Sequence, residues 1–275
     1  MIKSSGVLFI QGVIFMAENN EKIEKLQKMI DDSNRIVFFG GAGVSTESGV
    51  PDFRSENGLY NQKYDYGYPP ETMLSHTFWV AHRKDFFRFY YERILLEEVD
   101  TPSGKKIIEP NAAHIFLAKL EEAGKLSAVV TQNIDGLHQK AGNKKVYELH
   151  GTVMRNFCTK CHEMYDVDWM MDQKHKGIYE PVCDKCGAPV KPDVVLYEEG
   201  LDDDTVEGAV NAIRDADMLI IGGTSLVVYP AAGFVNYYRG NRLVLINKSL
   251  TGREAEADLV INDSIGQVFS QIHIN

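Results

Sequence analysis

The sequence RIVFFGGAGVSTESGVPDFR, residues 35–54, decides the fold. Its first part, Arg35 to Phe39, is an apolar, β-branched run that is typical of a buried strand. The GGAG run that follows allows a backbone to approach a phosphate where a strand leads into a helix. The segment therefore predicts a strand, a nucleotide-binding loop and a helix, with a plain glycine turn as the alternative. Thr46 stands where the common dinucleotide fingerprint has its third glycine.

Outside this segment, short apolar runs of strand length alternate with amphipathic stretches of helix length. A helical period covers residues 20–32, 114–123 and 205–216. Besides Arg35–Phe39, the expected strands are Ala128–Thr131, Val146–Leu149, Met218–Ile221, Leu243–Ile246 and Leu259–Ile261. Because strands that alternate with helices usually form a parallel sheet, we expect an α/β fold. It would be a Rossmann-like parallel sheet with helices on both faces.

Two blocks interrupt the alternation. Residues 61–110 are rich in aromatic side chains and are expected to form helices and loops, and residues 153–190 contain every cysteine of the chain. We expect the first to be a helical insertion and the second a zinc-binding module, together forming a smaller lobe. The nucleotide-binding domain would comprise residues 20–60, 111–152 and 191–275, and residues 1–15 would be a disordered extension.

Composition and charge exclude several classes of protein. With 275 residues, 44% of them hydrophobic, the chain is long enough to bury a large core. A net charge of −10 argues against nucleic acid as a partner. The apolar run at residues 7–15 is shorter than the roughly 20 residues of a membrane span and lacks a signal-peptide cleavage site. We therefore expect a cytoplasmic monomer that binds neither nucleic acid nor membranes.

The four cysteines all belong to two CxxC pairs. The 21 residues between the pairs come close to the spacing of a zinc ribbon. In a cytoplasmic protein, paired cysteines are more often metal ligands than disulfides. Four thiolates leave no open coordination position, so a zinc ion here would be structural and no thiol would remain for catalysis. The predicted ligands are Cys158, Cys161, Cys183 and Cys186.

Polar residues also follow three later strands. Asn133 and Asp135 come after the second expected strand, His150 after the third, and the run Gly223-Thr224-Ser225 after the fourth. Because the carboxyl ends of parallel strands meet at one edge of a sheet, we expect these loops to line one crevice. A histidine there, with a pKa near 6.5, can act as a general base. Turn chemistry and a structural histidine are the alternatives.

The motifs GAGVSTESGVPDFR, TQNIDGLH, ELHG, KPDVVLY and GTSLVVYPAAG, with the paired cysteines between them, resemble in order and spacing those of the sirtuin family. These are NAD-dependent protein lysine deacylases, here of the bacterial type. The resemblance runs from residue 20 to the C-terminus. It implies an NAD-binding domain and one structural Zn²⁺. It also implies a deacetylase that acts on acyl-lysine proteins or peptides and releases nicotinamide and O-acyl-ADP-ribose.

The resemblance implies roles for individual residues. The implied general base is His150, which relays a proton from the ribose hydroxyls, and the implied catalytic set also contains Asn133 and Asp135. The implied NAD-binding residues are Gly41, Ala42, Gly43, Thr46, Asp52, Phe53, Arg54, Gln132, Asn133, Ile134, Asp135, His150, Gly223, Thr224, Ser225, Asn247, Lys248 and Ile265. The substrate peptide would add as an extended strand beside Val194, Val195, Leu196 and Tyr197 and the segment 223–227.

Two departures from the family pattern concern the substrate. The usual Phe-Gly-Glu appears here as Tyr197-Glu198-Glu199. Family members that accept succinyl- or malonyl-lysine carry Tyr-x-x-Arg, and Tyr90 and Arg93 have this spacing. On one helix face, a phenol and a guanidinium could bind an acyl carboxylate, so a desuccinylase or demalonylase is an alternative. A mono-ADP-ribosyltransferase and an NAD-sensing binding module are further alternatives, and the intact catalytic set weighs against both.

Overall fold

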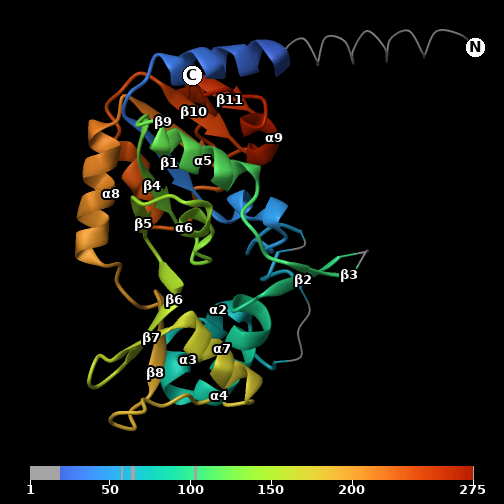
Figure 1. Cartoon of the computed structure of the whole chain (residues 1–275), viewed down its shortest axis with the longest axis vertical. Coiled ribbons are helices and arrows are strands. Elements are labelled where there is room, and N and C mark those ends of the chain that lie inside the picture. The colour runs from blue at the N-terminus through green and yellow to red at the C-terminus, as the bar shows by residue number, and fades with distance from the viewer. Residues whose placement is uncertain (1–18, 57, 63–65, 102–103, 275) are drawn as a thin grey trace, which may run out of the picture.

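The computed structural model describes residues 19–56, 58–62, 66–101 and 104–274, which form a larger and a smaller lobe (Figure 1). The expected extension at residues 1–15 lies outside them. The larger lobe contains a six-stranded sheet and the smaller one a three-stranded sheet with helices beside it. Among the described residues, no helix combines the length and the apolar character that crossing a membrane requires.

The six strands of the larger sheet are all parallel and follow the order β11-β10-β9-β1-β4-β5. They are β1 (Ile36–Gly40), β4 (Leu126–Thr131), β5 (Val146–Glu148), β9 (Met218–Gly222), β10 (Leu243–Ile246) and β11 (Leu259–Ile261). The α/β class and all six expected strands are confirmed. The chain adds strands first on one side of β1 and then on the other, so the order reverses between β1 and β9. Ligands of open parallel sheets bind at such a reversal.

Helices cover both faces of this sheet, as expected (Figure 1). They are the helix at residues 19–31, α5 (Ala112–Glu122), α6 (Leu137–Ala141), α8 (Asp203–Asp215), α9 (Ile265–Phe269) and the 3₁₀ segments η4 (Ala231–Tyr237) and η5 (Glu254–Glu256). Phe38 packs toward α5 and α9, and its neighbour Phe39 packs toward α8 and η4. Because both faces are buried, the strands are continuous apolar runs without polar alternation.

The α-helix expected directly after the glycine loop is wrong. Two short 3₁₀ turns, η1 (Ala42–Val44) and η2 (Thr46–Ser48), stand there instead. The second ends at Gly49, whose φ of 92° lies in the left-handed region and redirects the chain. Serine, threonine, glycine and the following Pro51 are all poor helix formers, which explains why a helix does not continue here.

The smaller lobe combines the two insertions. Its antiparallel sheet has the order β7-β6-β8. The elements are α2 (Pro70–Met73), α3 (His76–Ala81), α4 (Arg83–Phe89), the π-helical turn η3 (Tyr90–Ile94), β6 (Gly151–Cys158), β7 (Met164–Asp166), α7 (Val167–His175) and β8 (Val190–Val194). Helix α7 has no counterpart in the expected structure. The domain boundary expected at residue 191 falls within β8, which pairs with β6 in this lobe.

A β-hairpin, β2 (Glu98–Thr101) and β3 (Gly104–Ile107), projects from the middle of the molecule (Figure 1). The expectation of only helices and loops in residues 61–110 is therefore wrong for this segment. The four residues of β3 are all exposed, so no alternation of apolar and polar residues marks them as a strand. Val99 packs against the backbone of Gly49, which brings the hairpin beside the loop that follows β1.

Candidate active site

The loop after β1 packs tightly against the loop after β9. The backbone N–H groups of Gly41 and Gly43 donate to the carbonyl oxygens of Gly222 (3.3 Å) and Gly223 (2.8 Å). A Cβ added at Gly43 would lie 2.8 Å from the Cα of Gly223, and one added at Gly41 would lie 2.8 Å from the Cβ of Thr224. The close approach of two protein backbones, which we had assigned to a phosphate, therefore explains why glycine stands at both positions.

A buried serine joins the two polar residues that follow β4. Ser45 Oγ donates to Asp135 Oδ2 at 2.7 Å and accepts a hydrogen bond from Asn133 Nδ2 at 3.1 Å. The other carboxylate oxygen of Asp135 accepts the N–H of Leu137 at the start of α6 (2.9 Å). Burial raises the pKa of Asp135, and these two hydrogen bonds oppose the rise. The structure thus brings Asn133 and Asp135 together as expected, through a serine that the sequence analysis missed.

Asn111 connects this loop to the start of α5. Its Oδ1 caps α5 by accepting the N–H of Ala113 (2.9 Å), and its Nδ2 donates to the carbonyl oxygen of Val44 (2.7 Å) and to Ser48 Oγ (3.0 Å). A helix cap therefore fixes the loop that carries Ser45. The sequence analysis did not predict this role of Asn111; an asparagine directly before an amphipathic run is a signal from which the cap, but not the second contact, could have been found.

His150 lies just past β5 and is half-buried. Its Nδ1 is 3.0 Å from the carbonyl oxygen of Gln132, so Nδ1 carries the proton and Nε2 keeps its lone pair. Burial lowers the pKa of His150 below its ordinary value, and the positive charge of Arg54 lowers it further. The hydrogen bond to Gln132 raises the pKa and so opposes both effects. The imidazole is therefore neutral at pH 7, the state a general base needs.

Gln132 connects three of the expected loops. Its carbonyl oxygen orients His150, and its side-chain Nε2 donates to Thr224 Oγ1 at 3.0 Å. Its backbone N–H donates to the carbonyl oxygen of Gly40 at the end of β1 (3.0 Å). The ends of β1, β4, β5 and β9 thus meet in one network, as the sequence analysis expected.

The loop after Gly49 is folded back on itself. Asp52 Oδ1 accepts the backbone N–H groups of Arg54 (3.1 Å) and Ser55 (2.8 Å), so this carboxylate shapes the loop. The rings of Phe53 and Tyr60 make an edge contact with centroids 5.4 Å apart. Among the described residues, no carboxylate lies within 4.0 Å of the Arg54 guanidinium, which is exposed. The loop therefore presents an aromatic ring and a cation without a carboxylate partner.

The remaining residues of the expected cofactor set differ in exposure. Ala42, Thr46, Ile134 and Asn247 are half-buried, whereas Ser225 and Lys248 are exposed. Asn247 Nδ2 donates to the carbonyl oxygen of Ser249 (2.8 Å). Ile265 is only 2% exposed and belongs to the core that packs on Phe38, so its side chain is not available to a ligand.

The segment of this chain that is expected to pair with the substrate peptide makes hydrogen bonds of its own. The N–H of Val195 donates to the carbonyl oxygen of His150 (2.9 Å), that of Leu196 to Glu199 Oε2 (2.9 Å), and that of Tyr197 to Leu74 (3.0 Å). Three consecutive backbone donors are therefore already in use. The carbonyl oxygens of Val194, Leu196 and Tyr197 also accept hydrogen bonds, so this segment has little backbone capacity left for a further strand.

The expectation that Tyr90 and Arg93 lie on one face of an α-helix is wrong. They belong to the π-helical turn η3, whose wider turn changes which residues share a face. Tyr90 is 1% exposed, and its hydroxyl has no hydrogen-bond partner among the described residues. Arg93 Nε donates to the hydroxyl of Tyr66 (3.1 Å). The two side chains are thus in different environments, one apolar and one polar.

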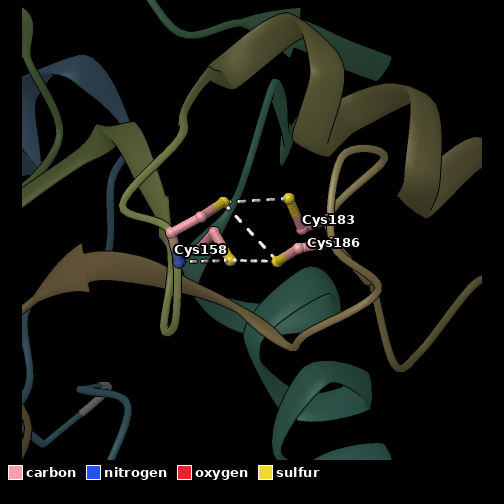
Figure 2. A group of neighbouring side chains, drawn as sticks. Cys158, Cys183 and Cys186 are labelled. Carbon is pink, nitrogen blue, oxygen red and sulfur yellow. Dashed lines mark hydrogen bonds between the residues drawn. The ribbon is translucent and has the colours of Figure 1, made fainter.

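The four cysteines converge in the small lobe, with their sulfur atoms all within 4.8 Å of one another. Figure 2 shows the side chains of Cys158, Cys183 and Cys186 pointing toward a common centre. The Sγ atoms of Cys158 and Cys186 are 3.4 Å apart, and Cys161 Sγ is 3.5 Å from Cys183 Sγ. Four sulfurs around tetrahedral zinc at about 2.3 Å would be just under 4 Å apart. The cluster can hold a metal ion.

Hydrogen bonds support this cluster. The hydroxyl of Tyr165 donates to Cys183 Sγ at 3.2 Å, which lowers the pKa of this thiol to about 6. The N–H groups of Lys160 and Cys161 point at Cys158 Sγ, each at 3.4 Å. Donors aimed at sulfur favour the thiolate, which is the form that binds metal. His162, next to Cys161, is exposed and is not part of the cluster.

Comparisons with known proteins found relatives of this chain. The model of the Sir2 family matches residues 41–230. A protein of Clostridium acetobutylicum named NAD-dependent protein deacetylase is 57% identical over 92% of this chain and 98% of its own length. One of the same name from Clostridium perfringens is 58% identical, over 92% and 99%. A solved structure of Sir2 with a p53 peptide and NAD⁺ superposes with a TM-score of 0.76 at 35% identity, covering 91% of this chain and 96% of that one.

Proposed function

The chain belongs to the Sir2 family and is an NAD-dependent protein deacetylase, and from this premise we propose which residues perform each part of the reaction. The enzyme acts on acyl-lysine with NAD and releases nicotinamide and O-acyl-ADP-ribose. A solved Sir2 structure bound to an acetylated peptide has a TM-score of 0.76 with this chain. The single observation that carries the assignment of residues is the meeting of four strand ends around His150.

We propose that His150 is the general base. Its Nδ1 is engaged by the carbonyl oxygen of Gln132, so Nε2 is the atom that accepts a proton from a ribose hydroxyl. The lowered pKa keeps the imidazole neutral at pH 7, at some cost in basicity. The carbonyl oxygen of His150 accepts the N–H of Val195, and its ring is held by Gln132, so the residue is fixed from both lobes.

We propose that NAD binds at the carboxyl ends of β1, β4, β5 and β9, beside the loop after Gly49. Its residues include a cation without a carboxylate partner, Arg54, which suits a diphosphate, and an aromatic ring, Phe53, which can cover a reacting ring and exclude water. NAD supplies the ADP-ribosyl group that receives the acyl group, and nicotinamide leaves. Asn133 and Asp135, held by Ser45, would bind around the nicotinamide ribose. Thr224, whose hydroxyl already meets Gln132, would lie on the adenosine side.

We propose that the four cysteines hold one structural Zn²⁺. Four sulfur atoms within 4.8 Å of one another, which leave no open coordination position, support a structural zinc ion rather than a catalytic one. The reduced state that such ligands need supports a cytoplasmic location. The monomeric state remains a prediction.

We propose that the peptide lies between the lobes, along Val194 to Tyr197 and the segment 223–227. On the first edge the donors of Val195, Leu196 and Tyr197 and most of the carbonyl groups are in use, so the second edge would carry most of the pairing. Ser225 and Val227 on that second edge are exposed, which supports this arrangement. Added strands gain affinity from the backbone and selectivity from alternate side chains.

An acetyl group is the acyl group that the geometry favours. Arg93 already donates to Tyr66, and Tyr90 lies among the rings of Phe86 and Phe87 in an apolar environment. A carboxylate would have to be desolvated there. The unpartnered Tyr90 hydroxyl is the one observation that favours succinyl- or malonyl-lysine instead.

Incubation with NAD and matched acetyl-, succinyl- and malonyl-lysine peptides tests this assignment, with peptide mass and nicotinamide read together. We expect the acetyl peptide to react fastest and to yield one nicotinamide for each deacetylated peptide. Faster turnover of the succinyl peptide would assign Tyr90 and Arg93 to an acyl carboxylate. Nicotinamide release with ADP-ribose left on a protein would instead indicate a transferase.

A further inference from the structure

We propose that Tyr197, on the peptide side of the site, positions Arg54 for NAD through its phenol hydroxyl. The family pattern has phenylalanine at this position, so the hydroxyl is a feature of this chain rather than of the pattern. The inference rests on the proposed role of Arg54 in binding NAD. It makes Tyr197 a positioning residue that acts on the co-substrate from the segment expected to receive the peptide.

The backbone of Tyr197 is fixed by the small lobe. Its N–H donates to the carbonyl oxygen of Leu74, and its own carbonyl oxygen accepts the N–H of His76, both at 3.0 Å. Ser75 and Tyr197 form a parallel bridge between these bonds. The next residue, Glu198, has a φ of 78°, and its carboxylate accepts the N–H (2.9 Å) and the hydroxyl (2.7 Å) of Thr77. These contacts determine where the ring of Tyr197 can point.

The side chain of Tyr197 reaches the loop after Gly49. Its hydroxyl oxygen is 3.0 Å from the hydroxyl of Tyr60 and accepts a longer hydrogen bond from Arg54 Nη2 at 3.4 Å. The Arg54 guanidinium also lies over the ring of Tyr60, with its Cζ 5.4 Å from the ring centroid. Two neutral aromatic side chains thus hold an exposed cation in place.

The neutral charge of the two tyrosines beside Arg54 matters for NAD binding. A carboxylate at this distance would neutralise Arg54 and compete with a diphosphate, whereas a phenol leaves the positive charge intact. A flexible, solvated arginine loses side-chain entropy when it binds an anion. Because Tyr60 and Tyr197 already restrict Arg54, this loss is smaller, and NAD binds more tightly than it would beside phenylalanine.

A double-mutant cycle on NAD affinity tests the proposal. The dissociation constant for NAD is measured by titration calorimetry without acyl peptide, so that no turnover occurs. Tyr197→Phe removes only the hydroxyl, and we expect it to raise the dissociation constant about three- to tenfold, because the lost hydrogen bond from Arg54 is long and exposed to solvent. Arg54→Gln should raise it by about tenfold or more. In the Arg54→Gln background, Tyr197→Phe should have no further effect.

Tyr238→Phe is the matched control, because it deletes a hydroxyl that bonds the carbonyl oxygen of Asp217 (3.1 Å) and the N–H of Arg242 (3.0 Å), away from the site. It should leave NAD affinity unchanged. If Arg54→Gln weakens NAD but Tyr197→Phe does not, or if Tyr197→Phe acts equally in both backgrounds, the inference is overturned and Arg54 keeps its proposed role. If Arg54→Gln leaves NAD affinity unchanged, the proposed role of Arg54 fails and the inference fails with it.

Discussion

The two lobes are stabilised in different ways. The larger lobe buries aliphatic side chains on both faces of six parallel strands. The smaller lobe has a three-stranded antiparallel sheet and a core of aromatic side chains that includes two of the four clustered cysteines. Parallel strands buried on both sides form a continuous core, whereas a small lobe with a limited core commonly needs a further constraint such as a structural metal ion. The larger lobe is therefore expected to fold without metal, and the smaller lobe to depend on it.

The two lobes also contribute different parts of the proposed reaction. The groups proposed to act on NAD, among them Asn133, Asp135 and His150, follow strands of the larger sheet. The segment proposed to receive the peptide follows β8 of the smaller sheet, directly after the turn that carries Cys183 and Cys186. Loss of the smaller lobe should therefore abolish turnover while the sheet and much of its site remain.

Removing the metal ligands should have the largest effect. In Cys183→Ser the cluster loses a buried thiolate, so we expect zinc loss, local unfolding of the smaller lobe and a fall in deacetylation of at least ~10²-fold. Metal content by mass spectrometry and hydrogen exchange by region measure this. His162→Asn is the control, because His162 is exposed and has a φ of 60°, which asparagine tolerates, and it should keep its zinc. If Cys183→Ser melted both lobes together, the proposed independence of the larger lobe would be wrong.

Within the larger lobe, Ser45→Ala should have the next largest effect. It removes the hydroxyl that joins Asn133 to Asp135, so both side chains lose their alignment, and we expect activity to fall about 10- to 100-fold. Ser48→Ala is the matched control, since this buried hydroxyl lies in the same loop and accepts from Asn111 instead. It should cost about 1 kcal/mol of stability with a smaller loss of activity. Equal losses of activity in both variants would contradict a specific role for Ser45.

A smaller, pH-dependent effect should also map to the larger lobe. His114 and His138 are buried with ring centroids 4.8 Å apart. Burial lowers the pKa of His114 to about 4 and that of His138 to about 3, where His114 contributes further. The fold therefore favours the neutral rings. Their contribution to the free energy of unfolding is complete above the unfolded pKa near 6.5 and is lost as the pH falls toward 4. At pH 5 each histidine should cost about 2 kcal/mol of unfolding free energy.

The measurement is urea unfolding at pH 7 and at pH 5. His138→Leu removes one titrating group, so the decrease between the two pH values should be about half that of the wild type. His82→Gln changes an exposed histidine and should keep the wild-type decrease. An unchanged decrease in His138→Leu would show that other groups cause the acid sensitivity.

The parts of this molecule that could be predicted from sequence are those with a local signal. Buried strands such as β1 are apolar runs, and the cysteine pairs have a spacing that only a metal site explains well. Ser45 could not be found, because its partner Asp135 is 90 positions away and one serine in a polar loop carries no pattern. The hairpin β2–β3 is exposed, and the π-helical turn at Tyr90 has no signature that distinguishes it from an α-helix. Contacts that only tertiary structure creates were missed.

The most direct test of the account is the rate of deacetylation by His150→Ala, measured as deacetylated peptide and nicotinamide at pH 7, with the melting temperature recorded alongside. Removing the base that the four strand ends position should lower the yield of deacetylated peptide at least ~10²-fold while the melting temperature stays close to that of the wild type. Near-normal turnover by a folded His150→Ala enzyme would contradict the account, since the proton would then be accepted elsewhere.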